Sequence, residues 1–324
     1  MWAIWAAFSL VHPAPAQDRV TILDRLGREV VRSGEVLEYN ARELRFRTRQ
    51  GQETQFAADR VRRVETPRTP THESADELFG RHLYVPALAN YREALQTESR
   101  RWVKRHLWAQ TVRCQRNLGQ IEQAASAFLV LLKEDPQTRD LDAIPLAWTA
   151  GEGNAALEQQ LRAWLTEPAR PWPRLIAASW LLTGHHRAVA RMALERLAQE
   201  DDPRIAQLAR LQRWRTEVAT ATSDQVMGWE RQLEDLSEPL RAGPNFVVGQ
   251  AYSRLGSVES ATLTLLRVPI LYPHHRHLAA EALSEAARLL QSSGRSEQAR
   301  RLQLELIRDY PGTVAAGHAQ RQMQ

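Results

Sequence analysis

The stretch GQIEQAASAFLVLLKEDP, residues 119–136, decides the fold of this chain. A glycine can end one helix in a tight turn, and an alanine five residues later lets the next helix approach closely. A large residue then fills the gap between the two helices, and a proline stops the second one. These residues stand at fixed intervals: Gly119, Ala124, Phe128, Leu131 and Pro136. The stretch therefore predicts a turn followed by a helix that packs back on its predecessor.

The same spacing occurs twice more, in GSVESATLTLLRVPILYP at residues 256–273 and in GRSEQARRLQLELIRDYP at residues 294–311. The two glycines that open these stretches are 38 residues apart, close to the roughly 34 residues of a helix-pair repeat. The matching residues are Gly256, Ala261, Leu265, Val268 and Pro273, and then Gly294, Ala299, Gln303, Leu306 and Pro311. Repeated helix pairs of this kind predict a stacked, mainly α-helical array.

These intervals resemble the tetratricopeptide repeat (TPR), and Trp108 also stands where that family prefers a tryptophan. The resemblance covers roughly residues 72–315, with the clearest repeats at about 105–138, 242–275 and 280–313. A weaker unit contains Ala87, Tyr91 and Ala94, where Leu83 and Pro86 disturb the expected turn. Residues 140–230 look like a degenerate or HEAT-like continuation. The resemblance implies a TPR/HEAT-like α-solenoid that binds a partner and performs no catalysis.

Residues 17–66 read in period two instead, which is typical of short strands. Five strands in so short a segment predict a small β-domain similar in layout to an SH3-like or Sm-like barrel. Arg45, Arg47 and Arg49 would share one face of a strand, either as a contact for an anionic envelope surface or as a solvated face. Residues 67–71 are interpreted as a linker and residues 72–324 as the helical array. This layout resembles exported bacterial TPR proteins with an N-terminal β-domain.

Residues 1–16 are predicted to be a signal peptide that is cleaved after Ala16. The apolar run from Trp2 to Val11 is too short to span a bilayer, and small residues at Ala14 and Ala16 suit a signal peptidase. No basic residue precedes Arg19, so a buried N-terminal helix is the alternative. Export predicts a periplasmic location, with no transmembrane helix.

The charge distribution and the histidine and cysteine residues argue against nucleic-acid binding, metal binding and thiol catalysis. The 43 basic and 38 acidic residues give a net charge of +5 that is spread along the chain, which disfavours nucleic-acid binding. His274, His275 and His277 lie in a turn and His185 and His186 are adjacent, so we expect solvated or structural histidines and no metal site. Cys114 is the only cysteine and is expected in the core. No cofactor motif and no catalytic motif is present.

In TPR arrays the first helix of each pair lines the concave face, and by that spacing eight residues are candidates for a peptide groove. Arginine and amide side chains suit a carboxylate or an extended peptide. The candidates are His106, Arg113, Arg116, Asn117, Phe246, Gln250, Arg254 and Arg288. We therefore expect a non-enzymatic scaffold that binds a protein or peptide in the cell envelope. The alternatives are a structural envelope protein whose β-domain contacts cell wall or membrane, and, more remotely, a hydrolase with an unrecognised site.

Overall fold

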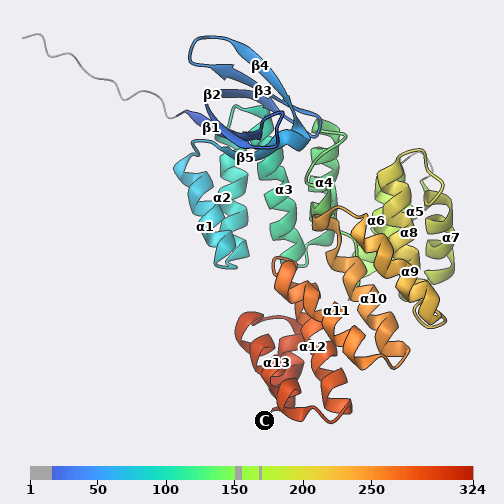
Figure 1. Ribbon diagram of the computed structural model, residues 1–324. Helices are drawn as coiled ribbons and strands as arrows, with labels where there is room; N and C mark the ends of the chain where they lie inside the picture. The colour runs from blue at the N-terminus through green and yellow to red at the C-terminus, as the bar shows by residue number, and fades with distance from the viewer. Residues whose placement is uncertain (1–16, 150–154, 168–169, 324) are drawn as a thin grey trace, which may run out of the picture.

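The computed structural model of the chain describes residues 17–149, 155–167 and 170–323. A small antiparallel sheet is followed by the helices α1 to α14, most of which pack on the next along the chain (Figure 1). This arrangement confirms the expected fold class, a helical solenoid behind an N-terminal β-domain. The predicted signal peptide lies outside the described residues.

The sheet contains five strands in the order β4-β3-β2-β1-β5, so its edges are β4 and β5. All of its neighbouring strands are antiparallel. The alternation predicted for residues 44–49 is present, because Leu44 and Phe46 are buried while Arg45, Arg47 and Arg49 are exposed. The strands are β1 (Asp18–Leu23), β2 (Glu29–Tyr39), β3 (Glu43–Thr48), β4 (Glu53–Ala57) and β5 (Val61–Glu65), with a 3-10 turn η1 (Ala58–Arg60) before β5.

Gly34 lies inside the continuous strand β2. The ring of Phe46 covers it from β3. A Cβ atom at residue 34 would lie 2.6 Å from Cζ of Phe46 and 2.2 Å from the carbonyl oxygen of Arg47. The glycine is therefore required for the close approach of a core ring to the backbone, and not for a turn.

The sheet and the first helices share one hydrophobic core, which includes Val20, Phe46 and Leu107. Trp102 on α3 donates its indole N–H to the carbonyl oxygen of Val36 at 3.2 Å. Arg105, also on α3, forms a 2.6 Å salt bridge with Glu38. The β-domain is thus anchored to the helices by buried polar contacts as well as by apolar packing.

The segment between sheet and helices is shorter than the predicted linker of residues 67–71. Helix α1 (Pro70–Gly80) starts at Pro70, and the hydroxyl of Thr69 accepts a hydrogen bond from the backbone N–H of His72. Proline is favoured at the first helical position, and threonine is a good N-cap. Thr69 and Pro70, which were assigned to the linker, therefore begin the helix.

The three predicted repeats are helix pairs of one design. Each glycine adopts a left-handed conformation, with φ of 71° at Gly119, 77° at Gly256 and 80° at Gly294. The alanine five residues later is fully buried in all three pairs: Ala124, Ala261 and Ala299. The pairs are α3 (Arg101–Asn117) with α4 (Ile121–Glu134), α10 (Ala242–Arg254) with α11 (Val258–Leu271), and α12 (Arg276–Ser292) with α13 (Ser296–Asp309), followed by α14 (Val314–Gln322).

The weaker first unit is also a helix pair, formed by α1 and α2 (Tyr84–Thr97). Among the described residues, His82 is the non-glycine residue with a positive φ, 61°. It stands five residues before the buried Ala87, which is the place that glycine takes in the other pairs. Pro86 lies in the first turn of α2, where a missing N–H does no harm. The turn expected to be disturbed therefore forms with a histidine in the left-handed position.

Replacing His82 separates this backbone effect from the loss of its side chain. His82→Gly and His82→Ala both lose the 3.1 Å contact between Nδ1 of His82 and the hydroxyl of Tyr84. The left-handed conformation costs alanine about 1 kcal/mol more than it costs glycine. We expect the glycine variant to have the higher free energy of unfolding by that amount, measured by chemical denaturation followed by circular dichroism. Equal stability of the two variants would contradict the assignment.

The middle of the array consists of five helices and one buried connection. The connection after α4 contains a 3-10 turn η2 (Leu141–Ala143) and then an extended segment whose residues 144–147 are buried. Gln212 and Arg215 of α8 donate hydrogen bonds to the carbonyl oxygen of Ala147, and Trp180 of α6 donates to that of Pro145. The helices are α5 (Ala155–Thr166), α6 (Pro171–Leu181), α7 (Arg187–Leu197), α8 (Pro203–Glu217) and α9 (Ser223–Glu234), with a 3-10 turn η3 (Glu238–Leu240) before α10.

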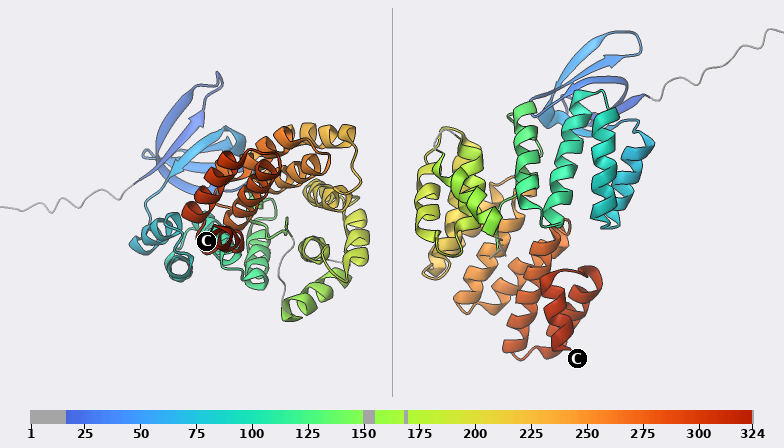
Figure 2. Two further views of the ribbon diagram at one scale, coloured as in Figure 1. Left: turned by 90° about the horizontal axis from the view of Figure 1, so that it is seen from below. Right: turned by 180° about the vertical axis from the view of Figure 1, so that it is seen from behind.

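The array bends so strongly that its C-terminal pairs return to its first pairs. Seen from below, the helices follow a ring (Figure 2), and α12 and α13 lie below α1 to α3 in the view of Figure 1. The guanidinium of Arg116 on α3 donates to Nδ1 of His275, at the start of α12, at 3.1 Å. His277 Nε2 lies 3.0 Å from the carbonyl oxygen of Asn117. Among the described residues, no helix has both the length and the apolar character needed to cross a membrane.

Candidate functional site

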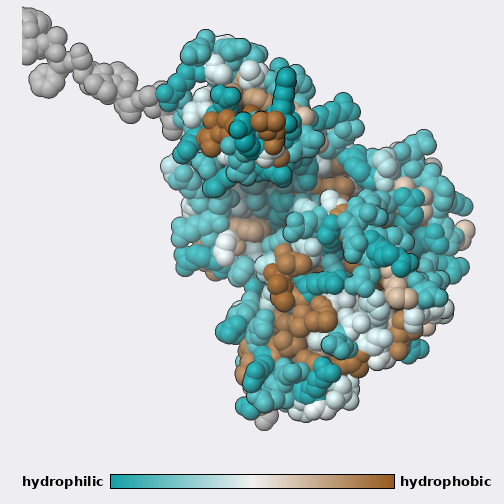
Figure 3. Space-filling view, in the orientation of Figure 1, coloured by the Kyte–Doolittle hydropathy of each residue, from teal (hydrophilic) through white to brown (hydrophobic). Residues whose placement is uncertain are grey.

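The closure of the array creates a cavity of about 690 Å³ between the sheet, α1, α3 and the end of α11. In the space-filling view the surface is hollowed below the sheet, and apolar side chains gather over α11 and its neighbours (Figure 3). Ile270 and Leu271, at the end of α11, are among the exposed large apolar residues, and Leu271 also lines the cavity. The cavity lining thus mixes apolar side chains, among them Phe79, Trp102 and Leu271, with charged and polar ones.

Arg113 forms one wall of the cavity and is held in place by two carboxylates. Its Nη2 atom lies 3.0 Å from Asp140 and 2.9 Å from Asp142, both from the connection that follows α4. Burial alone would lower the pKa of Arg113, but these carboxylates outweigh that effect and raise it. This arginine is therefore a fixed positive charge whose ionic partners already lie inside the chain.

Arg116, one turn further along α3, lies behind that wall. Its Nη1 atom donates to the carbonyl oxygen of Asp142 at 3.0 Å, and its Nη2 atom donates to His275. Burial lowers the pKa of Arg116 to about 10, so the guanidinium is still charged at neutral pH. Burial, together with Arg116 itself, holds the pKa of His275 well below its usual range. A neutral imidazole can accept the hydrogen bond, so this pair joins α3 to the start of α12.

Arg139 differs from Arg113 because no carboxylate of the described residues forms a salt bridge with it. Its guanidinium lies over the ring of Tyr39, with 4.6 Å between the guanidinium carbon and the ring centroid. Both residues line the cavity. The Arg139–Tyr39 pair therefore offers a cation and an aromatic face at the cavity wall.

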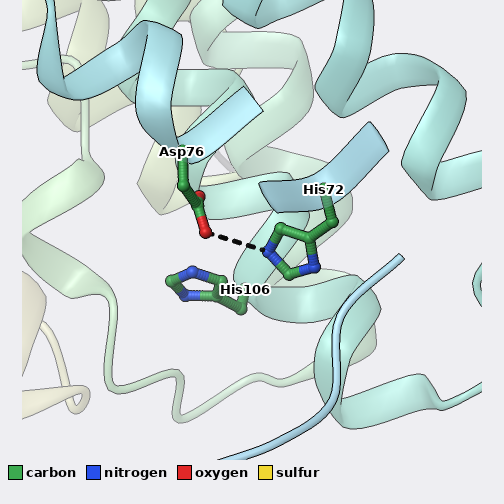
Figure 4. A group of neighbouring side chains, drawn as sticks. All are labelled: His72, Asp76 and His106. Atoms are coloured by element: carbon green, nitrogen blue, oxygen red, sulfur yellow. Dashed lines mark ion pairs between the residues drawn. The ribbon is translucent and has the colours of Figure 1, made fainter. Parts of the chain in front are cut away.

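Two histidines and an aspartate converge at the α1–α3 end of the cavity (Figure 4). His72 and Asp76 stand one turn apart on α1, and His106 comes from α3. One ligand atom from each of these three side chains lies within 4.8 Å of the other two. His72 Nε2 and Asp76 Oδ2 are 3.6 Å apart, and the two imidazole centroids are 6.0 Å apart. His72 and His106 both line the cavity.

Three further side chains surround this group. The hydroxyl of Tyr91 donates to Asp76 Oδ1 at 2.7 Å, and Arg68 forms a close salt bridge with Asp76 Oδ2. Gln110 Nε2 lies 3.4 Å from His106 Nε2. Burial lowers the pKa values of both His72 and His106. The two imidazoles are consequently neutral at pH 7 and have lone pairs available.

The structure brings only part of the predicted peptide groove together. His106 and Arg113 line the cavity, Arg116 lies behind it, and Asn117 donates its amide to the backbone oxygen of Arg113. In the later repeats Phe246 is buried, Gln250 donates to Glu285 at 3.1 Å, and Arg254 and Arg288 are exposed away from the cavity lining. Whether any of these residues contacts a peptide stays a prediction.

Sequence reasoning missed His72 and Asp76 as members of this group. A histidine and an aspartate four residues apart on one helix are the signal that was available, because i and i+4 side chains share a face. The third member, His106, was a candidate only as a groove residue. Nothing in local spacing could pair it with α1.

His275 and His277, which were expected to be structural or solvated, contact the end of α3. Cys114 is fully buried, and burial raises the pKa of its thiol to about 12. A thiol of that kind is unreactive at neutral pH.

Comparison of the sequence with protein-family models and with curated proteins found no match.

Proposed function

We propose that this chain is a non-enzymatic TPR-type scaffold that binds a segment of a protein or peptide partner in its cavity. Support for the TPR assignment comes from the three helix pairs with left-handed glycines and buried alanines at equal spacing. Proteins built in this way typically use their concave surface for recognition. The signal-like residues 1–16 favour action in a periplasmic compartment as part of the same proposal.

The observation that carries the proposal is the cavity itself. The return of the α11–α12 turn to α3 borders an open cavity of about 690 Å³, which is within the volume range of specific binding sites. A peptide segment of a few residues would place its apolar side chains near Leu271. An acidic group of the same segment would meet Arg139. We therefore expect the partner segment to combine an acidic group with neighbouring apolar residues.

Site-specific photocrosslinking in native envelopes tests this proposal. A photoreactive residue at position 271 faces the cavity rim, whereas one at position 192, on α7, marks an exposed surface elsewhere. We expect a discrete crosslinked partner from position 271 and none from position 192. Adding Arg139→Glu is expected to reduce that product by about tenfold, because it places a negative charge against an acidic segment.

The matched control is Arg196→Glu, an equal change of charge at an exposed position of α7. It should leave the product unchanged. The proposal fails if positions 271 and 192 capture the same products, or if Arg139→Glu and Arg196→Glu reduce capture equally.

A further inference from the structure

The His72–Asp76–His106 group has the composition and convergence of a metal site. Its three ligand atoms come from two different helices and lie within 4.8 Å of one another. In Figure 4 the two imidazole rings and the carboxylate turn toward a common region. Two imidazole nitrogens and one carboxylate oxygen form a donor set that suits zinc and other first-row divalent ions, whereas calcium and magnesium prefer oxygen ligands alone.

A second observation also points to a ligand here. The His72 side chain is only 2% exposed, yet neither of its ring nitrogens has a hydrogen-bond partner in the described structure. Buried polar atoms are nearly always paired, because an unpaired one loses its hydrogen bonds to water without replacement. A bound cation would satisfy the nitrogen that faces Asp76. In the described part of the chain, no protein contact compensates for removing the two ring nitrogens of His72 from water.

We propose that His72, Asp76 and His106 bind one Zn²⁺ ion, with an open coordination position that faces the cavity. The open position follows from the number of protein ligands, because zinc takes four and this group supplies three. It faces the cavity because His72 and His106 are part of the cavity lining. A carboxylate, a phosphate or a water molecule in the cavity is the kind of group that completes such a site.

The surroundings of Asp76 suit this role. The Tyr91 hydroxyl holds one carboxylate oxygen and leaves the other directed at His72. Arg68 pairs with that second oxygen, but its side chain is 41% exposed, so it withdraws to solvent when a cation takes its place. Tetrahedral zinc ligands lie about 3.4 Å apart, so the 3.6 Å between His72 and Asp76 already fits. His106 has to approach by roughly 1 Å, which a side-chain rotation supplies.

Metal titration of the purified full-length chain, stripped with a chelator, tests the assignment. We expect one equivalent of Zn²⁺ to bind with a Kd of roughly 1 µM or tighter, measured by competition with a chromogenic chelator. His106→Gln and Asp76→Asn should each weaken binding by about 100-fold or more, since each removes one of three ligands. His185→Gln, which changes an exposed histidine outside the site, is the control and should bind as the unaltered chain does.

A ligand exchange shows that His106 itself contacts the ion. His106→Cys should retain binding of Co²⁺ and add a thiolate-to-cobalt charge-transfer band that the unaltered chain lacks. Cys114 should not contribute to this band, because its thiol is buried in the core that the sheet shares with the first helices. Circular dichroism and the thermal midpoint of each variant separate loss of a ligand from loss of the fold.

Tyr91→Phe tests the positioning of Asp76 without removing a ligand. It deletes the 2.7 Å hydrogen bond to Asp76 and should weaken Zn²⁺ binding by about 10-fold to 100-fold. The assignment is overturned if the unaltered chain binds less than one equivalent at 10 µM free Zn²⁺, or if His106→Gln binds as tightly as His185→Gln. These results do not depend on the peptide proposal, because Zn²⁺ is the only probe.

Discussion

Gly243→Ala is expected to lower the free energy of unfolding by about 3 kcal/mol, the upper end of the usual range for overpacking a core. Gly243 lies in the first turn of α10, against the indole ring of Trp148 from the buried connection. A Cβ atom at residue 243 would lie 2.0 Å from Cδ2 and Cε2 of Trp148, well inside van der Waals contact. The ring is rigid, so either the helix or the connection has to move.

The matched control is Gly228→Ala, also inside a helix, α9. A Cβ atom there meets no other atom within 4 Å. The gain in helix propensity should therefore stabilise the chain by about 0.5–1 kcal/mol. Urea denaturation followed by circular dichroism measures both changes. Equal stabilities of the two variants would show that Trp148 does not pack against Gly243 in solution.

Arg215→Met is expected to destabilise the chain by about 4 kcal/mol, because one side chain supplies donors to several buried carbonyl groups. Its Nη1 atom donates to the carbonyl oxygens of Ala147 at 2.9 Å and Ser179 at 2.7 Å, and its Nη2 atom donates to that of Thr149 at 3.2 Å. Burial lowers the pKa of Arg215 to about 10, so it is charged at neutral pH and its hydrogen bonds are charge-assisted. Methionine has a similar length and no N–H donor.

Arg213→Met, on the same helix, provides the comparison. Arg213 is 38% exposed, and it pairs at 3.4 Å with Glu217, one turn away. Exposed pairs at this spacing contribute only about 0.3–0.5 kcal/mol. Chemical denaturation of the two variants measures the loss in free energy of unfolding. Hydrogen exchange of the backbone N–H of Ala147 measures how far the buried connection has loosened. Similar losses in both variants would mean that Arg215 does not hold the buried connection.

Local spacing predicted the helix pairs because every contact that defines them is close in sequence. The turn at Gly119 and the packing of Ala124 depend on residues within one repeat, and the same is true at Gly256 and Gly294. The left-handed residue of the first pair was harder to recognise, since His82 takes the place of a glycine. A pattern that searches for glycine finds no turn there, although the backbone forms one.

The candidate site was largely hidden from the sequence for a different reason. Arg116 meets His275 across a separation of 159 residues, and no periodicity reports such a contact. The histidines at 274–277 look like an ordinary turn until the array bends back on itself. Likewise the His72–Asp76 pair becomes a three-ligand group only when the fold brings His106 of α3 within reach of α1. Repeat patterns predict neighbours along the array and do not predict its curvature.

The contact between α3 and the start of α12 also has a consequence for the order in which this chain matures. In an open array each unit needs only its neighbours, so folding can advance step by step from either end. Here the carbonyl and imidazole partners of the Arg116 guanidinium come from two distant segments, and the later one follows it by 159 residues. Such distant pairings slow folding, because a long loop must close before the contact forms. During synthesis the Arg116 guanidinium therefore remains incompletely paired until His275 has left the ribosome.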